Sequence, residues 1–250
     1  MRLDDLVRYC DDYLNVRQVG DAPEALNGLQ VANGGEVTRM AAAVDLCAAT
    51  VQMAAEQRAN LLLVHHGLFW GGLRPLVGPQ FDRASGLLRH DIALYSAHLP
   101  LDCHPEVGNA AVLAGRLGVA IRGTFGTWHE QTWGMWGQLE VSRDDLTERL
   151  AQALGAKPKV LPFGPATVRR VGIATGAGGS IIPQASAAGL DTFITGEGAH
   201  HTYFDAEELH LNVYFGGHYA TETFGVKALA EHLAEKFGLP WVFLEHPTGL

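Results

Sequence analysis

The sequence predicts an α/β protein of two lobes, with mostly parallel sheets flanked by helices. Short continuous apolar runs, typical of strands buried on both faces, alternate with segments of helical periodicity. Hydrophobic residues make up 47% of the 250 residues and charged residues 18%, so material for a packed core is ample. The alternation breaks once, within residues 126–141, which indicates a division of the chain.

The first half of the chain alternates regularly. A helix is expected over residues 3–14 (LDDLVRYCDDYL), where apolar residues recur at helical spacing. The loop that follows contains Pro23 and the turn-forming pair Asn27-Gly28. Further strands are expected over 40–47, 60–66 and 92–98, and further helices over 49–59, 81–91 and 108–118. Gly118 stands where a glycine commonly ends a helix.

The stretch that breaks the rhythm, GTWHEQTWGMWGQLEV, carries three of the five tryptophans among glycines. We interpret it as a surface loop with packing aromatic side chains, with a substrate-lining role as the alternative. We place a domain change near it. Beyond it, helices are expected over 145–155, 181–189 and 223–238, and strands over 168–176, 190–197, 211–217 and 241–247.

Composition disfavours several classes of protein. The net charge is −9, and lysines and arginines are sparse, whereas a nucleic-acid binder needs a basic face. The three cysteines form no CxxC pair, which fits a reducing, cytoplasmic compartment better than a disulfide framework. No secretory signal is visible at the N-terminus. No apolar run approaches the length that crosses a bilayer.

Histidines and acidic residues gather where three predicted strands end. The strands concerned end in LLLV, ALYSA and VYFGG. The groups are His65 with His66, His98 with Asp102, and His218 with Glu222. Ligands collect at the carboxyl edge of parallel α/β sheets, so residues far apart in sequence can meet there. Each pair alone is also typical of a structural histidine or a solvated helix face, and the prediction depends on their joint occurrence.

These residue types suit a metal. Imidazole and carboxylate together bind zinc, iron or manganese, whereas calcium and magnesium prefer oxygen ligands. Five ligands drawn from these six side chains, including both carboxylates, exceed what one catalytic metal ion usually takes from protein. A carboxylate bridging two ions roughly 3.5–4 Å apart explains the excess.

Two further motifs are less specific. VGIATGAGGS (171–180) is similar to a glycine-rich phosphate cradle but lacks the Walker ending, so we favour a tight strand-to-helix turn. In TGEGAHH (195–201), Glu197 and His201 either line the site or bond locally, and the sequence leaves both alternatives open.

The ordered motifs resemble one known family. NGLQV (27–31), VHHGLFW (64–70), SAHLPLD (96–102), GAGGS (176–180), TGEGAHH (195–201) and GGHYATE (216–222) appear in that order. Together they look like the NGG-interacting-factor-like dinuclear metal-centre proteins, which include the YbgI-like proteins. The motifs span nearly the whole chain, and the ordered set is far more specific than any one motif.

The resemblance implies a ligand set and an assembly. Two divalent ions per chain would be held by His65, His66, Asp102, His218 and Glu222. The remaining site histidine corresponds to His98, close to the metals but not a firm ligand. Family members form two-lobed α/β subunits in ring-shaped homohexamers. Applied to this chain, the resemblance implies one metal-binding lobe of residues 1–125 and 217–250, and a second lobe of 126–216. The family's usual His-Thr-Asn-Leu-Asp element reads His-Leu-Pro-Leu-Asp here, which keeps the ligands but weakens any transfer of substrate contacts from that loop.

The hypothesis from the sequence is a dinuclear metal-dependent hydrolase. Members of the family are often described as homologues of a type 2 GTP cyclohydrolase I, which points to a small-molecule substrate such as a nucleotide ring. His98 is the candidate for proton transfer, because the ordinary pKa of histidine suits that task. The alternatives are a metal-dependent phosphoesterase and a non-catalytic metal-binding or scaffolding hexamer.

Overall fold

The structure is a computed structural model that describes residues 1–128 and 130–249, and the chain forms two compact units. Unit 1 comprises Met1–Val107 and Gly225–His246, and unit 2 comprises Gly108–Phe224 with the last residues from Pro247 onward. The lobe boundaries expected from sequence differ from these units at residues 108–125, at 217–224 and from 247 onward, and they stay a prediction.

Unit 1 is built on a five-stranded sheet with the order β1-β4-β3-β2-β11. Its strands are β1 (Gly28–Val31), β2 (Met40–Asp45), β3 (Leu61–His66), β4 (Ala93–Ser96) and β11 (Trp241–Phe243). Its helices are α1 (Leu3–Tyr13), the 3₁₀ helix η1 (Pro23–Ala25), α2 (Ala48–Glu56), α3 (Pro79–Arg89), α4 (Leu99–Asp102) and most of α9 (His218–Phe237). The four strands from β11 to β4 are parallel, and β1 pairs with β4 antiparallel.

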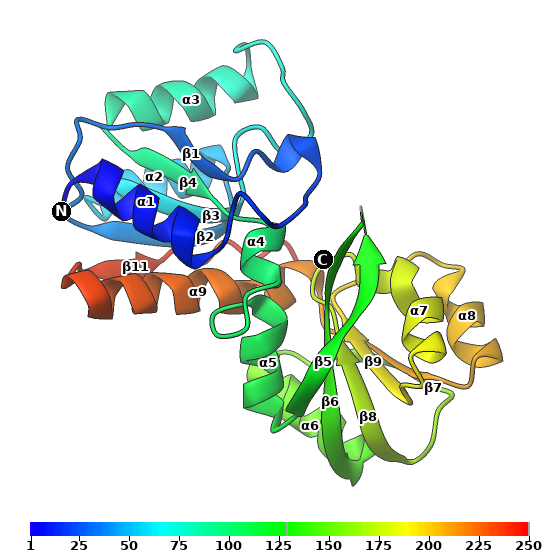
Figure 1. Cartoon of the computed structure of the whole chain (residues 1–250). Helices are drawn as coiled ribbons and strands as arrows, with labels where there is room; N and C mark the ends of the chain where they lie inside the picture. The colour runs from blue at the N-terminus through cyan, green and yellow to red at the C-terminus, as the bar shows by residue number, and fades with distance from the viewer. Residues whose placement is uncertain (129, 250) are drawn as a thin grey trace. The chain divides into compact units, whose positions relative to one another are not determined.

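Helices cover both faces of this sheet (Figure 1). Alternate side chains of β2 and β3, such as Ala41 and Leu62, pack against α2 and α3 in one apolar cluster. On the other face, Tyr95 of β4 donates a 2.9 Å hydrogen bond from its hydroxyl to Asp11 of α1. Because both faces are buried, the strands are the continuous apolar runs that the sequence shows.

Unit 2 is built on a six-stranded sheet with the order β5-β6-β8-β9-β10-β7. Its strands are β5 (Ala120–Trp128), β6 (Gln131–Ser142), β7 (Lys159–Pro162), β8 (Thr167–Ile173), β9 (Thr192–Thr195) and β10 (Asn212–Phe215). Its helices are α5 (Asn109–Leu117), α6 (Arg143–Leu154), η2 (Gly178–Ile181), α7 (Ile182–Ala187), α8 (Thr202–Glu208) and the first turns of α9. Figure 1 shows α5 and α6 on one face and α7 and α8 on the other.

The α/β class is confirmed, but the expectation of mostly parallel sheets is wrong: both sheets are mixed. In unit 2 only β8, β9 and β10 run parallel, while β5, β6 and β7 pair antiparallel with their neighbours. The physical reason is the short link from β5 to β6, since a parallel crossover needs a dozen or more residues. The aromatic stretch 126–141 was expected to be a loop. Residues 126–128 and 131–141 belong to these two strands, residue 130 is in a turn, and residue 129 lies outside the described residues.

The predicted end of α5 is confirmed, whereas α6 begins at Arg143, two residues before its predicted start at 145. Gly118 closes α5 in the left-handed region, with φ of 79°. Ser142 caps α6, its Oγ accepting a hydrogen bond from the backbone N–H of Asp145 at 3.0 Å. Among the described residues, the structure contains no helix that is both long enough and apolar enough to span a bilayer.

Candidate metal centre

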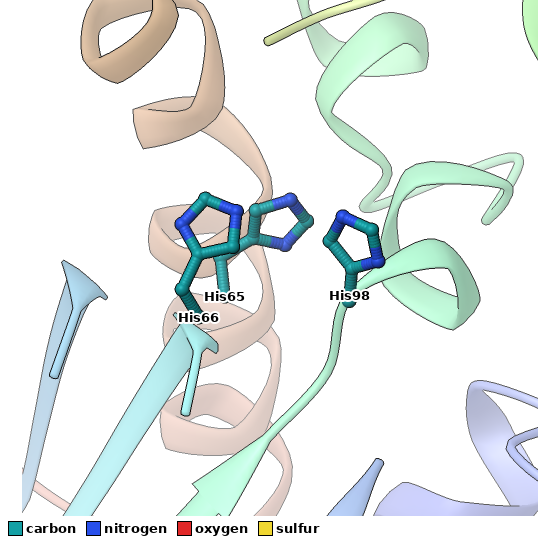
Figure 2. Close-up of side chains that lie close together, drawn as sticks. All are labelled: His65, His66 and His98. Carbon is teal, nitrogen blue, oxygen red and sulfur yellow. The ribbon is translucent and has the colours of Figure 1, made fainter. Parts of the chain in front are cut away.

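Three histidines of unit 1 lie together at the carboxyl edge of its sheet. His65 and His66 are the last residues of β3, and His98 follows β4, the parallel neighbour of β3. Each can offer one ring nitrogen such that the three nitrogens lie within 4.8 Å of one another. Figure 2 shows the three rings gathered beyond the strand ends. The grouping that strand alternation predicted within this half of the chain is therefore present.

Asp102 joins this group through a short helix. Helix α4 begins directly after His98 and accepts Pro100 in its first turn, where a proline N–H is not needed. One turn later, Oδ2 of Asp102 lies 3.5 Å from Nε2 of His65. The side chains of His65 and Asp102 are 0% and 4% exposed. The i,i+4 spacing of His98 and Asp102 thus turns both side chains toward the same buried place, despite the proline between them.

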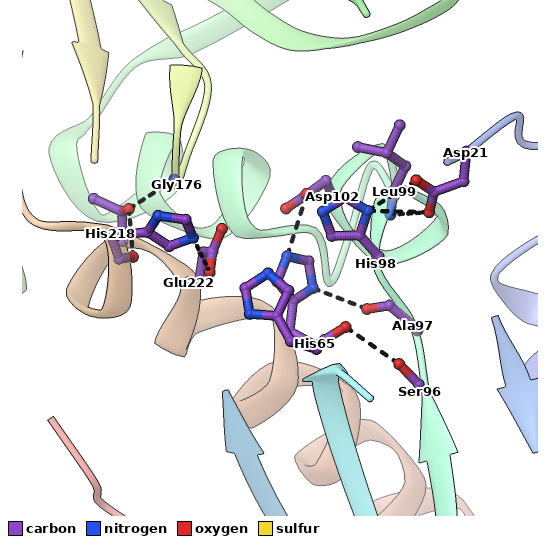
Figure 3. Close-up of polar contacts among 12 residues, drawn as sticks. Asp21, His65, Ser96, Ala97, His98, Leu99, Asp102, Gly176, His218 and Glu222 are labelled. Carbon is purple, nitrogen blue, oxygen red and sulfur yellow. Dashed lines mark hydrogen bonds and ion pairs between the residues drawn. The ribbon is translucent and has the colours of Figure 1, made fainter. Parts of the chain in front are cut away.

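The three imidazoles are oriented in the same way. Nδ1 of His65 lies 2.9 Å from the carbonyl oxygen of Ala97, and Nδ1 of His66 lies 2.8 Å from Oδ1 of Asp45. Nδ1 of His98 lies 2.9 Å from Oδ1 of Asp21 (Figure 3). Carbonyl and carboxylate oxygens only accept hydrogen bonds, so each Nδ1 carries the hydrogen and donates it. Each neutral ring then presents its Nε2 lone pair.

Asp21 is the centre of a buried network beneath His98. Its carboxylate accepts hydrogen bonds from the side-chain amide of Asn27 at 2.8 Å and from the backbone N–H of Leu99 at 3.0 Å. The side-chain oxygen of Asn27 in turn accepts the backbone N–H of His98 at 2.7 Å. Burial raises the pKa of Asp21, but the hydrogen bonds and charge of His98 outweigh it and hold that pKa below its usual value.

Unit 2 contributes His218 and Glu222 from the first turns of α9. Nε2 of His218 lies 3.1 Å from Oε2 of Glu222, and Nδ1 of His218 lies 2.8 Å from Oε1 of Glu197. The hydrogen bond with Glu222 is the main cause that raises the pKa of His218 to about 9; burial opposes the shift, and Glu197 adds to it. In the metal-free protein His218 is therefore mostly protonated at neutral pH.

A glycine makes room for this pair. Gly176 follows β8 with φ of +62°, a conformation that side chains rarely adopt. A Cβ atom at this position would overlap Oε1 of Glu222 and would lie 3.3 Å from Nε2 of His218. Its backbone N–H donates to the hydroxyl of Thr221 at 3.0 Å, which fixes the turn against α9. The glycine-rich segment thus forms the predicted tight turn from strand β8 toward η2 and α7.

The donor sets fit divalent metal ions. When the rings are neutral with hydrogen on Nδ1, the lone pair of His218 Nε2 faces Oε2 of Glu222 at 3.1 Å, and that of His65 Nε2 faces Oδ2 of Asp102 at 3.5 Å. Such pairs repel unless a proton or a cation lies between them. Imidazole nitrogen with carboxylate oxygen is the chemistry of zinc, iron and manganese sites. Each histidine also has the oxygen acceptor at its other nitrogen that metal-ligating histidines almost always have.

A small cavity opens beside Glu197. Its volume is about 390 Å³, and its wall includes Ser180, Glu197, His201 and Thr202 with glycines and alanines from the turns around residues 177–179 and 198–199. Glu197 therefore both bonds His218 and faces this cavity. His201, at the start of α8, lies on the same cavity wall. The sequence left open whether Glu197 and His201 line the site or only bond locally. Of these two residues, Glu197 contacts His218, a candidate metal ligand.

The match to known proteins decides the family. A model of the family described as Duf34/NIF3 (NGG1p interacting factor 3) matches residues 1–248. The chain belongs to the NIF3 family. The resemblance drawn from the ordered motifs is thereby confirmed over almost the whole chain.

Relatives within the NIF3 family are similar from end to end. A Halobacterium salinarum protein named GTP cyclohydrolase 1 type 2 homolog is 45% identical over 256 residues, which cover 100% of both chains. A protein of the same name from Deinococcus radiodurans is 43% identical over 99% of this chain and 94% of its own length. The structure of TTHA1606 from Thermus thermophilus superposes with a TM-score of 0.91 at 43% identity over 100% of both chains. Protein ybgI, of unknown function, gives 0.92 at 37% identity over 100% of both chains.

Sequence reasoning missed several groups that this NIF3 chain places beside its histidines. Asp45 ends β2 in register with His66, so the strand-end argument could have found it. Asp21 stands in an irregular loop and left no signal. The ring of Trp70 lies 4.9 Å from the ring of His66 and 4.5 Å from that of His98, as centroid distances.

Proposed function

We propose that this NIF3 protein is a metal-dependent hydrolase in which His65, His66, Asp102, His218 and Glu222 bind two divalent ions. The observation that carries the proposal is the common orientation of the histidines. Oxygen acceptors take the Nδ1 hydrogens, and Nε2 of His65 and His218 lies 3.5 Å and 3.1 Å from a carboxylate oxygen. That arrangement is unfavourable for neutral imidazoles alone and suits a cation.

The chain's own groups would do the remaining chemistry. Bound divalent ions would lower the pKa of water and polarise a substrate oxygen. His98 is suited to move a proton at Nε2, because Asp21 holds its Nδ1 hydrogen and stabilises the imidazolium form that arises on proton uptake. The burial of His65 and Asp102 keeps bulk water from these ligands. The cavity beside Glu197 gives room for a small molecule.

The substrate class rests on relatives. The H. salinarum and D. radiodurans proteins are named as homologues of GTP cyclohydrolase 1 type 2, and we propose a nucleotide ring that is opened by hydrolysis. A phosphoester is the second candidate, since two metal ions suit in-line displacement at phosphorus equally well.

A non-catalytic role in metal binding or scaffolding is the alternative from a different class. The nearly complete burial of three proposed ligands favours it: His65, Asp102 and Glu222 are 0%, 3% and 3% exposed. A metal ion whose coordination positions are all taken by protein ligands has no position left for substrate or water. Assembly as a homohexamer and a cytoplasmic location remain predictions.

Metal content measured on protein purified without chelators is the first test. We expect close to two ions per wild-type chain, and loss of both in the double variant His66→Ala with Glu222→Ala. His90→Ala, at an exposed histidine that ends α3, is the matched control and should keep the wild-type content. The loaded protein is then incubated with GTP, and purine absorbance and phosphate release are followed separately. Absence of metal from the wild type after reconstitution would end the proposal, and metal without turnover would favour the binding role.

A further inference from the structure

We propose that Asp45, Glu197 and Asp21 are positioning residues for the metal centre. Each takes the Nδ1 hydrogen of one histidine, so that the Nε2 of that ring carries a lone pair able to bind a metal ion or a proton. That these contacts serve metal binding rests on the proposed function. The contacts themselves are the hydrogen bonds described above.

The positions of the ring hydrogens follow from the acceptors beside them. An ionised carboxylate has no hydrogen to donate, so the 2.8 Å contacts from Asp45 to His66 and from Glu197 to His218 require hydrogen on both Nδ1 atoms. A neutral histidine side chain in water favours the opposite tautomer, with hydrogen on Nε2. A ring in that tautomer cannot bind a metal ion through Nε2, because that atom has no free lone pair. At His66 the carboxylate therefore reverses the intrinsic preference and keeps the lone pair on Nε2. At His218 the neutral ring faces two carboxylates, and the 2.8 Å contact of Nδ1 with Glu197 is shorter than the 3.1 Å contact of Nε2 with Glu222, which favours the same tautomer.

The carboxylates come from segments separate from their histidines. Asp45 ends β2, the parallel neighbour of β3, and the sheet register pairs it with His66. Glu197 follows β9, which lies beside β10 in the sheet, and α9 with His218 begins just after β10. The same device is thus built independently at two sheet edges. Repetition in unrelated local sequences is what a shared chemical requirement produces.

Burial separates the three positions experimentally. The side chain of Asp21 is 6% exposed and also binds the backbone of Leu99, so it supports the loop as well as His98. The side chains of Asp45 and Glu197 are 40% and 49% exposed. Replacing the latter two removes a ring acceptor without emptying a buried space, which makes them the better test positions.

The test compares tautomers and metal affinity in the intact chain. Histidine labelled with ¹⁵N reports which ring nitrogen carries hydrogen in the metal-free protein, at a pH high enough for the rings to be neutral. We expect His66 in Asp45→Ala and His218 in Glu197→Ala to gain the Nε2–H tautomer. Zinc titration should show a dissociation constant about 10–100-fold higher than in the wild type. Asp45→Asn keeps an oxygen acceptor of similar size and should retain the tautomer and most of the affinity.

Glu140→Ala is the matched control, because Glu140 is an exposed carboxylate that pairs with Arg169 and with none of the histidines that the structure describes. Wild-type tautomers and wild-type zinc affinity in both alanine variants would overturn the inference, and so would changes no larger than those of Glu140→Ala. The two proposals fail separately. A wild type that binds no zinc while its variants switch tautomer would refute the hydrolase but leave the positioning role. A wild type that binds zinc while its variants keep their tautomers would refute the positioning role but leave the hydrolase.

Discussion

The missing Cβ atom of Gly176 allows Glu222 and His218 to lie against the glycine-rich turn. The positive φ of Gly176 and the overlap that a Cβ would make with Glu222 are two separate costs. Backbone strain of this kind is worth about 1–3 kcal/mol. The overlap, in contrast, acts on the carboxylate itself, and it therefore affects metal binding more than folding.

The replacement Gly176→Ala should consequently lower zinc affinity by more than tenfold, measured by competition with a chelator of known affinity, because Glu222 must leave its place beside His218. Gly155→Ala is the control. Gly155 has φ of +74°, in the same region of backbone space, and a Cβ there would meet nothing within 4 Å. We expect Gly155→Ala to lose stability by about 1 kcal/mol while keeping wild-type affinity. Equal losses of affinity in the two variants would show that the backbone alone matters.

At the scale of elements, the buried strands and the polar groups at their ends could be predicted. Continuous apolar runs such as LLLV leave few alternatives to a buried strand, and His65 and His66 then had to lie at its end. The hairpin β5–β6 could not be predicted in the same way. Gly134 and Gly137 alternate there with tryptophans because their missing side chains admit the neighbouring strand β5, and glycines in a sequence indicate turns more often than close strand packing.

The carboxylates behind the histidines show a second limit. Asp45 and Glu197 follow strands, so their positions can be found from the sequence, but their role as acceptors for Nδ1 of His66 and His218 cannot, because it depends on contacts between separate segments. Helix α9 gives the opposite case. It begins at His218, five residues before the predicted start at 223, because the two glycines ahead of it obscure the boundary. His218 and Glu222 were therefore predicted as a pair, although the predicted helix did not include them.

The loop after β3 carries a reporter for the neighbouring site. Trp70 is 40% exposed, with its ring 4.5 Å from that of His98 and 4.9 Å from that of His66. A divalent ion bound at these histidines draws electron density from the imidazoles and makes them stronger quenchers of indole fluorescence. We expect zinc to lower the tryptophan emission, and Trp70→Phe to abolish the change. Trp241→Phe should keep the response, and its loss there instead would place the ion elsewhere.

For the whole molecule, metal binding and protonation compete for the same lone pairs, which gives stability an expected dependence on pH. The pKa of His218 rises from 6.5 to about 9 on folding without metal. Its contribution to metal-free stability is thus complete below pH 6.5 and is lost as the pH rises through 9. A ligand that binds only the folded state stabilises it by RT ln(1 + [L]/Kd), and its apparent Kd falls as His218 loses its proton.

Thermal unfolding with saturating zinc and with a chelator should therefore give two Tm values whose gap widens between pH 6.5 and 9. At one hundred times the dissociation constant, the zinc term is about 2.7 kcal/mol. His218→Gln removes the titrating group, and the gap should then be smaller and nearly flat over that range. A gap that narrows with rising pH in the wild type would contradict the assignment of His218 as a metal ligand, because a histidine ligand must release its proton before it can bind the ion.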